Sequence, residues 1–156
     1  MLFNSKIFLK INGFDKNYFL YYEENDYFKK CNILDLKLYL IANSYYNHPK
    51  SKKDNKSLKI NSVKFSNIEE KNNTYCVAGW HGSWSKFYYL RKYNGYIKAF
   101  IMCLPHIILS IIQMLLCSFV DFNKAKYKYY KIEGFVCSAL GMSSFKRSKY
   151  DKKNIY

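Results

Sequence analysis

FLKINGFDKNYFLYYEENDYFKKC, residues 8–31, carries the strongest local signals in the chain. Its Gly-Phe-Asp sequence at residues 13–15 is typical of a turn. The acidic Glu-Glu-Asn-Asp cluster at residues 23–26 follows, and carboxylates in a first helical turn meet the positive end of the helix dipole. We therefore expect a helix to begin at this cluster. Its apolar face, at helical spacing, comprises Tyr27, Phe28, Cys31 and Leu34.

The residues after this helix predict a strand and then a break in the fold. Residues 36–41, Leu-Lys-Leu-Tyr-Leu-Ile, begin with the apolar–polar alternation of a half-buried strand. Residues 51–75 are rich in Lys, Asn and Ser and have few apolar anchors, which indicates a linker. The sequence therefore predicts an α/β part over residues 1–50, a linker over 51–75 and a helical part over 76–156.

An apolar run occupies residues 99–120 and contains no formal charge. At 1.5 Å per residue it is long enough to cross a hydrocarbon core of roughly 30 Å. Three placements stay open: a helix lying in the membrane interface, a spanning helix, and a buried helix of a soluble protein. Four residues weaken the simple spanning interpretation: Pro105, His106, Ser110 and Gln113.

Basic residues lie on both sides of this apolar run. The chain has a net charge of +15, with ten basic and three acidic residues over 51–98 and nine basic and two acidic over 122–156. Basic residues beside a lipid-seeking segment add roughly 1 kcal/mol each of attraction to acidic headgroups. Basic residues on both sides of the apolar run favour an anionic membrane surface as the binding partner. A nucleic-acid partner is disfavoured, because the sequence contains no helix-turn-helix, RRM or zinc pattern.

The final helix and the cysteines complete the pattern. Apolar and aromatic residues recur over 127–140, and Gly141 follows them as a C-terminal cap. The five cysteines form no CxxC pair, and two lie in the apolar run. This arrangement is typical of thiols in a reducing compartment rather than of a disulfide framework.

Four stretches of the chain resemble rhamnosyltransferase-like family 2 glycosyltransferases. In that family a Gly-Phe-Asp turn leads to FLYxEExD and a helix, as in residues 8–31 here. The stretch LYLIANSYYNHP resembles the family's next strand, which ends in a His, and places His48 at that position. Residues 80–95 and 133–147 resemble the family's C-terminal helical extension.

The resemblance implies a fold and an activity. Members have a GT-A type α/β fold, whose N-terminal half binds the nucleotide-sugar and supplies an Asp-x-Asp metal motif; this sequence contains no Asp-x-Asp. We therefore expect an α/β fragment, the C-terminal part of a GT-A domain, followed by membrane-associated α-helices. The expected function is transfer of a sugar with inversion to a polysaccharide or lipid-linked acceptor at the cytoplasmic face of the membrane. The chain would be inactive alone, because the donor-binding half is missing. A truncated gene, a mis-called start and a split protein with a separately encoded N-terminal half all stay open as the reason. The alternative is a non-catalytic membrane-surface protein.

The resemblance also implies catalytic and metal-binding residues. Inverting transfer needs a base for the acceptor hydroxyl, and a carboxylate suits this role. Glu24 matches the family's base, with Asp26 as the second candidate and Glu23 beside them. His48 would ligate Mn²⁺ or Mg²⁺ together with phosphate oxygens of the nucleotide-sugar. Each of these carboxylates also has a purely structural interpretation, as an acid in the first turn of a helix.

Three further residues are candidates for substrate binding: Asp15, Trp80 and Trp84. Asp15 otherwise shapes the turn at residues 13–15. The two tryptophans either form a platform that stacks on a sugar or anchor the chain at a membrane interface.

Overall fold

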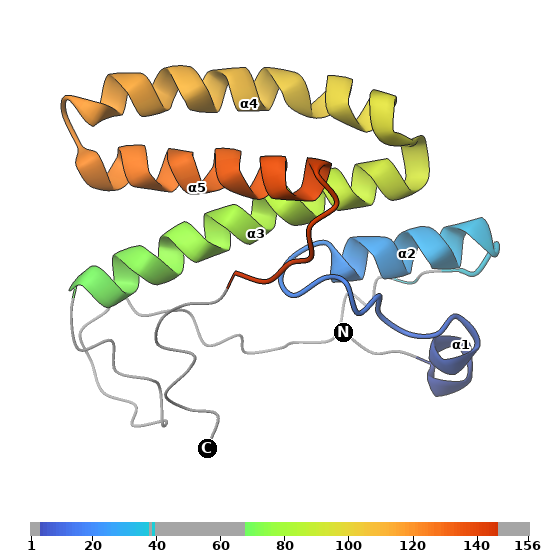
Figure 1. Cartoon of the computed structure of the whole chain (residues 1–156). Helices are drawn as coiled ribbons and strands as arrows, with labels where there is room; N and C mark the ends of the chain where they lie inside the picture. Colours follow the sequence, from blue (N-terminus) through green and yellow to red (C-terminus); the bar gives the residue numbers. More distant parts are fainter. Residues whose placement is uncertain (1–3, 38, 40–67, 147–156) are drawn as a thin grey trace, which may run out of the picture.

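A computed structural model describes residues 4–37, 39 and 68–146 of the chain, and within them the backbone is helical with no strand. Five helices occur in order (Figure 1): α1 Ser5–Lys10, α2 Glu23–Ile33, α3 Ile68–Asn94, α4 Tyr96–Ser118 and α5 Phe122–Ala139.

The α/β prediction is therefore wrong for the described residues. Of the predicted strand at residues 36–41, only Leu36, Lys37 and Tyr39 are described, and none lies in a strand. The backbone N–H of Leu36 donates to the carbonyl of Cys31 at 2.9 Å, so it closes the end of α2 instead of joining a ladder. The first part of the chain folds as two short helices, not as the edge of a sheet. α1 and α2 pack against each other through Phe8, Ile11 and Tyr27, and Asp26 of α2 pairs with Lys92 of α3.

Other predicted elements are present. α2 begins at Glu23, as the acidic cluster predicts, and Gly141 follows α5 with φ +77°, the left-handed conformation of a C-terminal cap. α3 begins at Ile68, inside the segment predicted to be a linker, and α5 begins at Phe122, before residue 127. The rest of the predicted linker and His48 lie outside the described residues.

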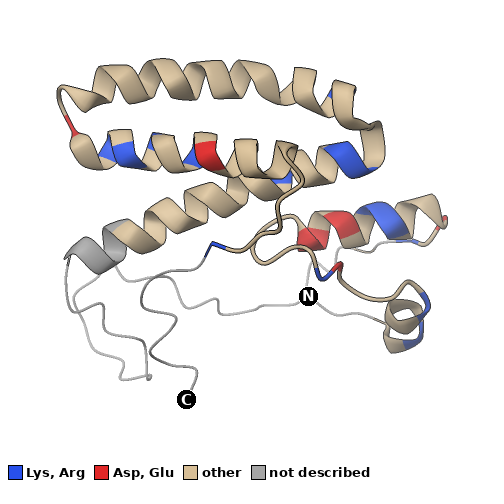
Figure 2. Cartoon of the chain, in the orientation of Figure 1, with Lys and Arg blue, Asp and Glu red and all other residues tan. Residues whose placement is uncertain are grey.

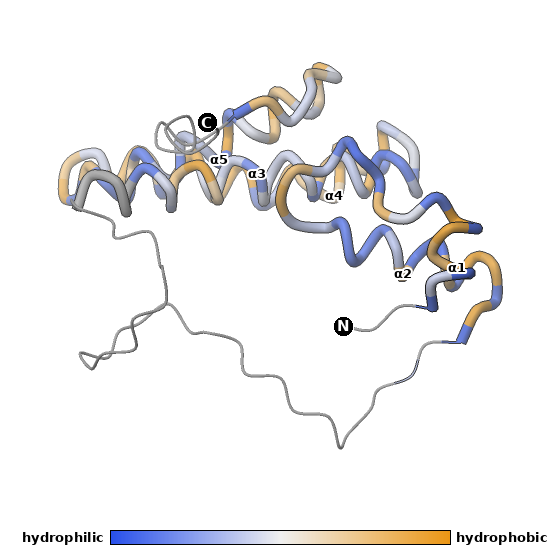
Figure 3. Tube along the Cα trace, turned by 90° about the horizontal axis from the view of Figure 1, so that it is seen from below, coloured by the Kyte–Doolittle hydropathy of each residue, from blue (hydrophilic) through white to orange (hydrophobic). Residues whose placement is uncertain are grey.

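The three long helices form one layer. In Figure 1, α5 lies between α4 and α3, and the view from below in Figure 3 shows the same three helices overlapping. α1 and α2 lie together at one end of this layer. Because α4 is at the outer edge of the layer, much of its surface has no protein neighbour.

The contact between α3 and α5 is close and holds the largest buried side chains. A Cβ atom added at Gly134 of α5 would collide with the backbone of Trp80 on α3, so only glycine fits this crossing. Trp80 and Phe87 are fully buried and Trp84 nearly so. The Trp84 indole N–H donates to the carbonyl of Met142 at 2.9 Å, which fastens the chain after α5 onto α3.

Candidate functional site

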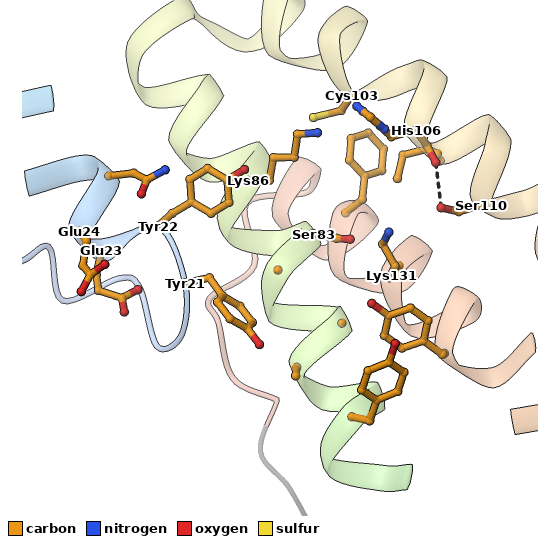
Figure 4. Close-up of a pocket in the computed structure, with 18 residues that line it drawn as sticks. Tyr21, Tyr22, Glu23, Glu24, Ser83, Lys86, Cys103, His106, Ser110 and Lys131 are labelled. Atoms are coloured by element: carbon orange, nitrogen blue, oxygen red, sulfur yellow. Dashed lines mark hydrogen bonds between the residues drawn. The ribbon is translucent and has the colours of Figure 1, made fainter. Parts of the chain in front are cut away.

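A cavity of about 660 Å³ lies where the start of α2 meets α3, α4 and α5 (Figure 4). α3 and α4 each contribute one wall of the cavity, formed by residues three or four positions apart, which lie on the same face of a helix. The α3 wall comprises Gly79, Gly82, Ser83 and Lys86, and the α4 wall comprises Cys103, His106, Ile107 and Ser110.

The start of α2 turns toward the cavity through two unusual residues. Tyr21 and Tyr22 both have φ +67°, the left-handed region that side chains other than glycine seldom adopt. Backbone in this region costs energy and tends to occur where function requires a particular geometry. Both tyrosines line the cavity, immediately before Glu23 and Glu24.

Two of the three predicted catalytic carboxylates reach the cavity. Glu23 and Glu24 both line it, on the side of α2 (Figure 4). Glu24 is exposed, whereas Oε2 of Glu23 is buried and accepts no hydrogen bond from another described residue. A carboxylate oxygen withdrawn from water without a donor is costly, so this atom is the one most in need of a ligand.

Asp26, the third carboxylate, has a structural role instead. Its side chain is fully buried and pairs with Lys92 at 2.7 Å and with Lys30 at 3.4 Å, and it accepts a hydrogen bond from the Tyr93 hydroxyl at 2.8 Å. It does not line the cavity. Asp26 therefore holds α2 against the C-terminal end of α3, and its catalytic role stays a prediction.

Asp15 belongs to the same polar cluster. Its carboxylate pairs with Lys92 at 2.7 Å and accepts a hydrogen bond from the backbone N–H of Asn17 at 3.0 Å. Burial raises the pKa of Asp15, but the bonds from Lys92 and from Asn17 outweigh it and hold the pKa below its usual value. These contacts assign Asp15 to the turn and its attachment to α3, rather than to a substrate.

Trp80 and Trp84 are also interior residues. Trp80 is 0% exposed and Trp84 is 3% exposed, and their rings stack with centroids 6.5 Å apart. Neither ring lines the cavity. In this structure both rings therefore lie in the contact between α3 and its neighbours, away from the cavity, and their roles in stacking on a sugar or anchoring at a membrane interface stay predictions.

Two lysines in the cavity were not among the predicted site residues. Lys86 comes from α3 and Lys131 from α5, and neither makes an ion pair with a described carboxylate. Burial and the positive charges of Lys128 and Lys86 lower the pKa of Lys131. The cavity therefore holds two lysines and, at its α2 side, the carboxylates of Glu23 and Glu24, with no ion pair between them.

The sequence contains the signal for this site in its spacing. Small and polar residues at 79, 82, 83 and 86 share one face of α3, as do those at 103, 106 and 110 of α4. Small or polar residues on an inward helical face leave room that large apolar ones would fill. The local motif around residues 23–26 points to one side of the cavity but carries no information on α3 or α5.

The predicted metal site is not assembled by the described residues. In residues 4–37, 39 and 68–146, no three His, Cys, Asp or Glu side chains come together as metal ligands. His48, the expected ligand, lies outside this part. The described residues therefore do not test the predicted Mn²⁺ or Mg²⁺ site, which stays a prediction.

Comparison of the sequence with family models, with curated proteins and with solved structures gave no match. The function is therefore argued from the chain's own geometry.

Proposed function

We propose that this chain binds the surface of an anionic membrane through the outer face of α4. α4 is the one helix in the described part of the chain that is long and apolar enough to cross a membrane. Only 11% of its most apolar window is buried. The observation that carries the proposal is that a strongly apolar helix has most of its surface uncovered by protein.

The two sides of α4 differ in the size of their residues. The buried members are Ala99, Cys103 and Ser110, all small. The exposed members are large, and four of them lie at 48–66% exposure: Ile101, Ile108, Leu115 and Leu116. Burying one Leu or Ile side chain contributes about 1.5–3 kcal/mol, so a bilayer that covers this face binds strongly.

The position of α5 favours α4 lying in the plane of the interface. α5 runs back along α4 after a short connection (Figure 1), and its first half is basic whereas α4 is almost uncharged (Figure 2). If α4 spanned the bilayer, α5 would carry its lysines into hydrocarbon, at about 2.5–3.5 kcal/mol for each one at the centre. With α4 lying flat, the same lysines reach acidic headgroups: Lys124, Lys126 and Lys128.

The cysteines support a cytoplasmic leaflet. All five are unpaired thiols, and four of them are buried. Free thiols are characteristic of reducing compartments. We therefore place the protein on the cytoplasmic side of the membrane.

Flotation with lipid vesicles tests the membrane surface. The triple variant Ile101→Ser, Ile108→Ser, Leu115→Ser removes one stripe of the exposed face of α4. Because each residue contributes more than 1 kcal/mol when buried in lipid, binding to phosphatidylglycerol-containing vesicles should fall at least tenfold.

The matched control replaces three exposed apolar residues away from α4: Leu9, Ile33 and Leu34, each to Ser. This control should bind vesicles like the wild type. Equal binding by the two triple variants would contradict the proposal. So would lipid-free dimerisation that the α4 substitutions abolish, because the face would then be covered by a second copy of the chain.

A second candidate function is a part in sugar transfer. The observation that favours it is that Glu23 and Glu24, which lie within the sequence that resembles family 2 glycosyltransferases, line a cavity. Under this proposal Glu24 is the base, and a donor-binding partner chain supplies the nucleotide-sugar for transfer to a lipid-linked acceptor.

A transfer assay with a radiolabelled nucleotide-sugar tests this candidate. Glu24→Gln should abolish transfer when the donor-binding partner is present, while Asp35→Asn, an exposed acid after α2, should not. Unchanged activity of Glu24→Gln would remove Glu24 as the base. Robust transfer by the 156-residue chain alone would contradict the need for a partner.

A further inference from the structure

We propose that Lys86 and Lys131 form a binding site for the phosphate monoester headgroup of a membrane lipid. The inference rests on the proposed membrane function, because a bilayer against α4 brings lipid headgroups to this cavity. It adds a specific site to what is otherwise general attraction between a basic protein and an anionic surface.

The cavity brings the two lysines together from different helices. Lys86 and Lys131 both line it, one from α3 and the other from α5 (Figure 4). Lys131 is half-buried, and the charges that shift its titration are those of two other lysines. Two like charges that line one cavity repel each other, and a dianion bound between them removes that repulsion.

The acids of the described chain do not neutralise these lysines. The carboxylates that form ion pairs do so with other cations: Asp15 and Asp26 with Lys92, Asp26 also with Lys30, Asp121 with Lys124, and Glu133 with Lys146. Glu23 and Glu24 also line the cavity, but they enter from the α2 side, whereas the lysines come from α3 and α5 (Figure 4). The cavity thus has a cationic region distinct from its acidic edge.

The donors of this region suit a terminal phosphate. Lysine is a common phosphate ligand, and charge-assisted hydrogen bonds to phosphate are among the stronger ones. Ser83, whose side chain carries a hydroxyl, lines the same cavity. Two ammonium groups and one hydroxyl match the three terminal oxygens and roughly two charges of a monoester. A diester, with one charge and a bulky substituent, matches them less well.

The cavity is also placed for a lipid. One of its walls is α4, where His106 is exposed and Ile107 half-buried. The apolar outer face of the same helix continues from this wall, so acyl chains can stay in the bilayer while the headgroup reaches between α3 and α5. A volume of about 660 Å³ holds a headgroup without rearrangement.

The test compares two anionic lipids at equal surface charge. Phosphatidylcholine vesicles carry either dioleoyl phosphatidic acid, a monoester, or dioleoyl phosphatidylglycerol, a diester, in amounts matched by zeta potential. The wild type should bind the phosphatidic acid vesicles about tenfold more tightly. The double variant Lys86→Ala, Lys131→Ala should lose that preference.

The double variant Lys124→Ala, Lys126→Ala is the matched control, because it removes the same charge from residues that do not line the cavity. It should bind both kinds of vesicle more weakly and keep the preference for phosphatidic acid. No preference in the wild type, or equal loss of preference in both double variants, would overturn the site. Thermal unfolding of each variant checks that it is folded.

A lipid-free titration separates the site from membrane binding. Dihexanoyl phosphatidic acid, below its micelle concentration, should bind the wild type and the α4 serine variant but not Lys86→Ala, Lys131→Ala. If it binds while vesicles do not, the membrane proposal fails and the site stands; if vesicles bind while it does not, the site fails alone. Inorganic phosphate that binds equally tightly would show an anion site with no role for the lipid.

Discussion

α3 and α4 are neighbouring long helices that use apolar residues in opposite ways. α3 buries its large rings, with Trp80 and Phe87 at 0% exposure. α4 buries small residues such as Ala99 and Cys103 and exposes large ones such as Leu116, at 66%. The less hydrophobic helix is therefore the core of the fold, and the more hydrophobic one is its surface.

This difference follows from what each helix contacts. α3 has α5 against one side and the polar cluster of Asp15 and Asp26 at its C-terminal end. α4 lies at the edge of the helical layer and has protein on one side only. The contrast predicts that substitutions on α3 change the stability of the fold, and that substitutions on the outer face of α4 change only what binds there.

The largest expected effect comes from truncating the core ring of α3. Trp80→Ala removes a fully buried side chain and should lower the free energy of unfolding by about 3–5 kcal/mol. Leu116→Ala on α4 removes a side chain that is 66% exposed and should change it by less than about 0.5 kcal/mol. Urea unfolding in lipid-free buffer measures both. Similar losses would mean that α4 is covered by another surface in solution.

The close crossing of α5 over α3 gives the next largest effect. Gly134→Ala places a Cβ against the backbone of Trp80, so the two helices must separate. Overpacking of this kind costs about 1–3 kcal/mol. Gly82→Ala on α3 is the control, because its nearest neighbour is the Tyr21 ring at 3.7 Å. This control should stabilise the helix by up to about 1 kcal/mol, and a loss there as large as at Gly134 would refute the crossing.

Sequence reasoning found local features and missed those made by several helices. The acidic cluster predicts the start of α2 because helix capping depends on adjacent residues. The cluster does not show that Glu24 and Asp26 have different surroundings. Glu24 lines the cavity, whereas Asp26 pairs with Lys92 of α3, 66 residues further along the chain. The position of Trp80 and Trp84 shortly before an apolar run predicts that they lie on the surface of the protein. Their burial depends on Gly134, which lets α5 approach closely enough to cover Trp80.

The α/β expectation failed for a related reason. Alternating residues at the start of 36–41 are compatible with a strand, but a strand needs a partner to satisfy its backbone groups. Here the N–H of Leu36 bonds back to Cys31. The apolar run at 99–120, by contrast, is long enough to predict a helix by itself. Its length leaves open whether that helix lies in a membrane interface, spans a membrane or is buried in a soluble protein.

A smaller effect is expected from the buried carboxylate that joins α2 to α3. Asp26→Asn removes the charge that faces Lys92 and weakens the bond from Tyr93. Because hydrogen bonds to charged groups contribute about 1.5–3 kcal/mol, and Lys92 keeps Asp15 as a partner, we expect a loss of about 2 kcal/mol in urea unfolding. Glu24→Gln, at an exposed carboxylate of the same helix, should lose less than about 0.5 kcal/mol. Equal losses would contradict the structural role of Asp26.

The smallest effect is a pH dependence located at Asp15. The pKa of this carboxyl is lowered in the folded chain by Lys92 and Asn17, against the effect of burial. A group with a lowered folded pKa stabilises the protein above its unfolded pKa of about 3.9, and that contribution is lost as pH falls through the lower folded value. Asp15→Asn should therefore unfold at lower urea than the wild type at pH 6, and the difference should shrink below about pH 4.

The same measurement on the α4 serine variant supplies the contrast. α4 has no Asp or Glu between Tyr96 and Ser118, so this variant should keep the acid sensitivity of the wild type. A difference between Asp15→Asn and wild type that stays constant from pH 6 to pH 3 would show that the loss comes from the turn geometry rather than from the ion pair with Lys92. In that case α3 would hold the N-terminal segment by packing alone. The polar cluster at the C-terminal end of α3 would then not be a source of stability that α4 lacks.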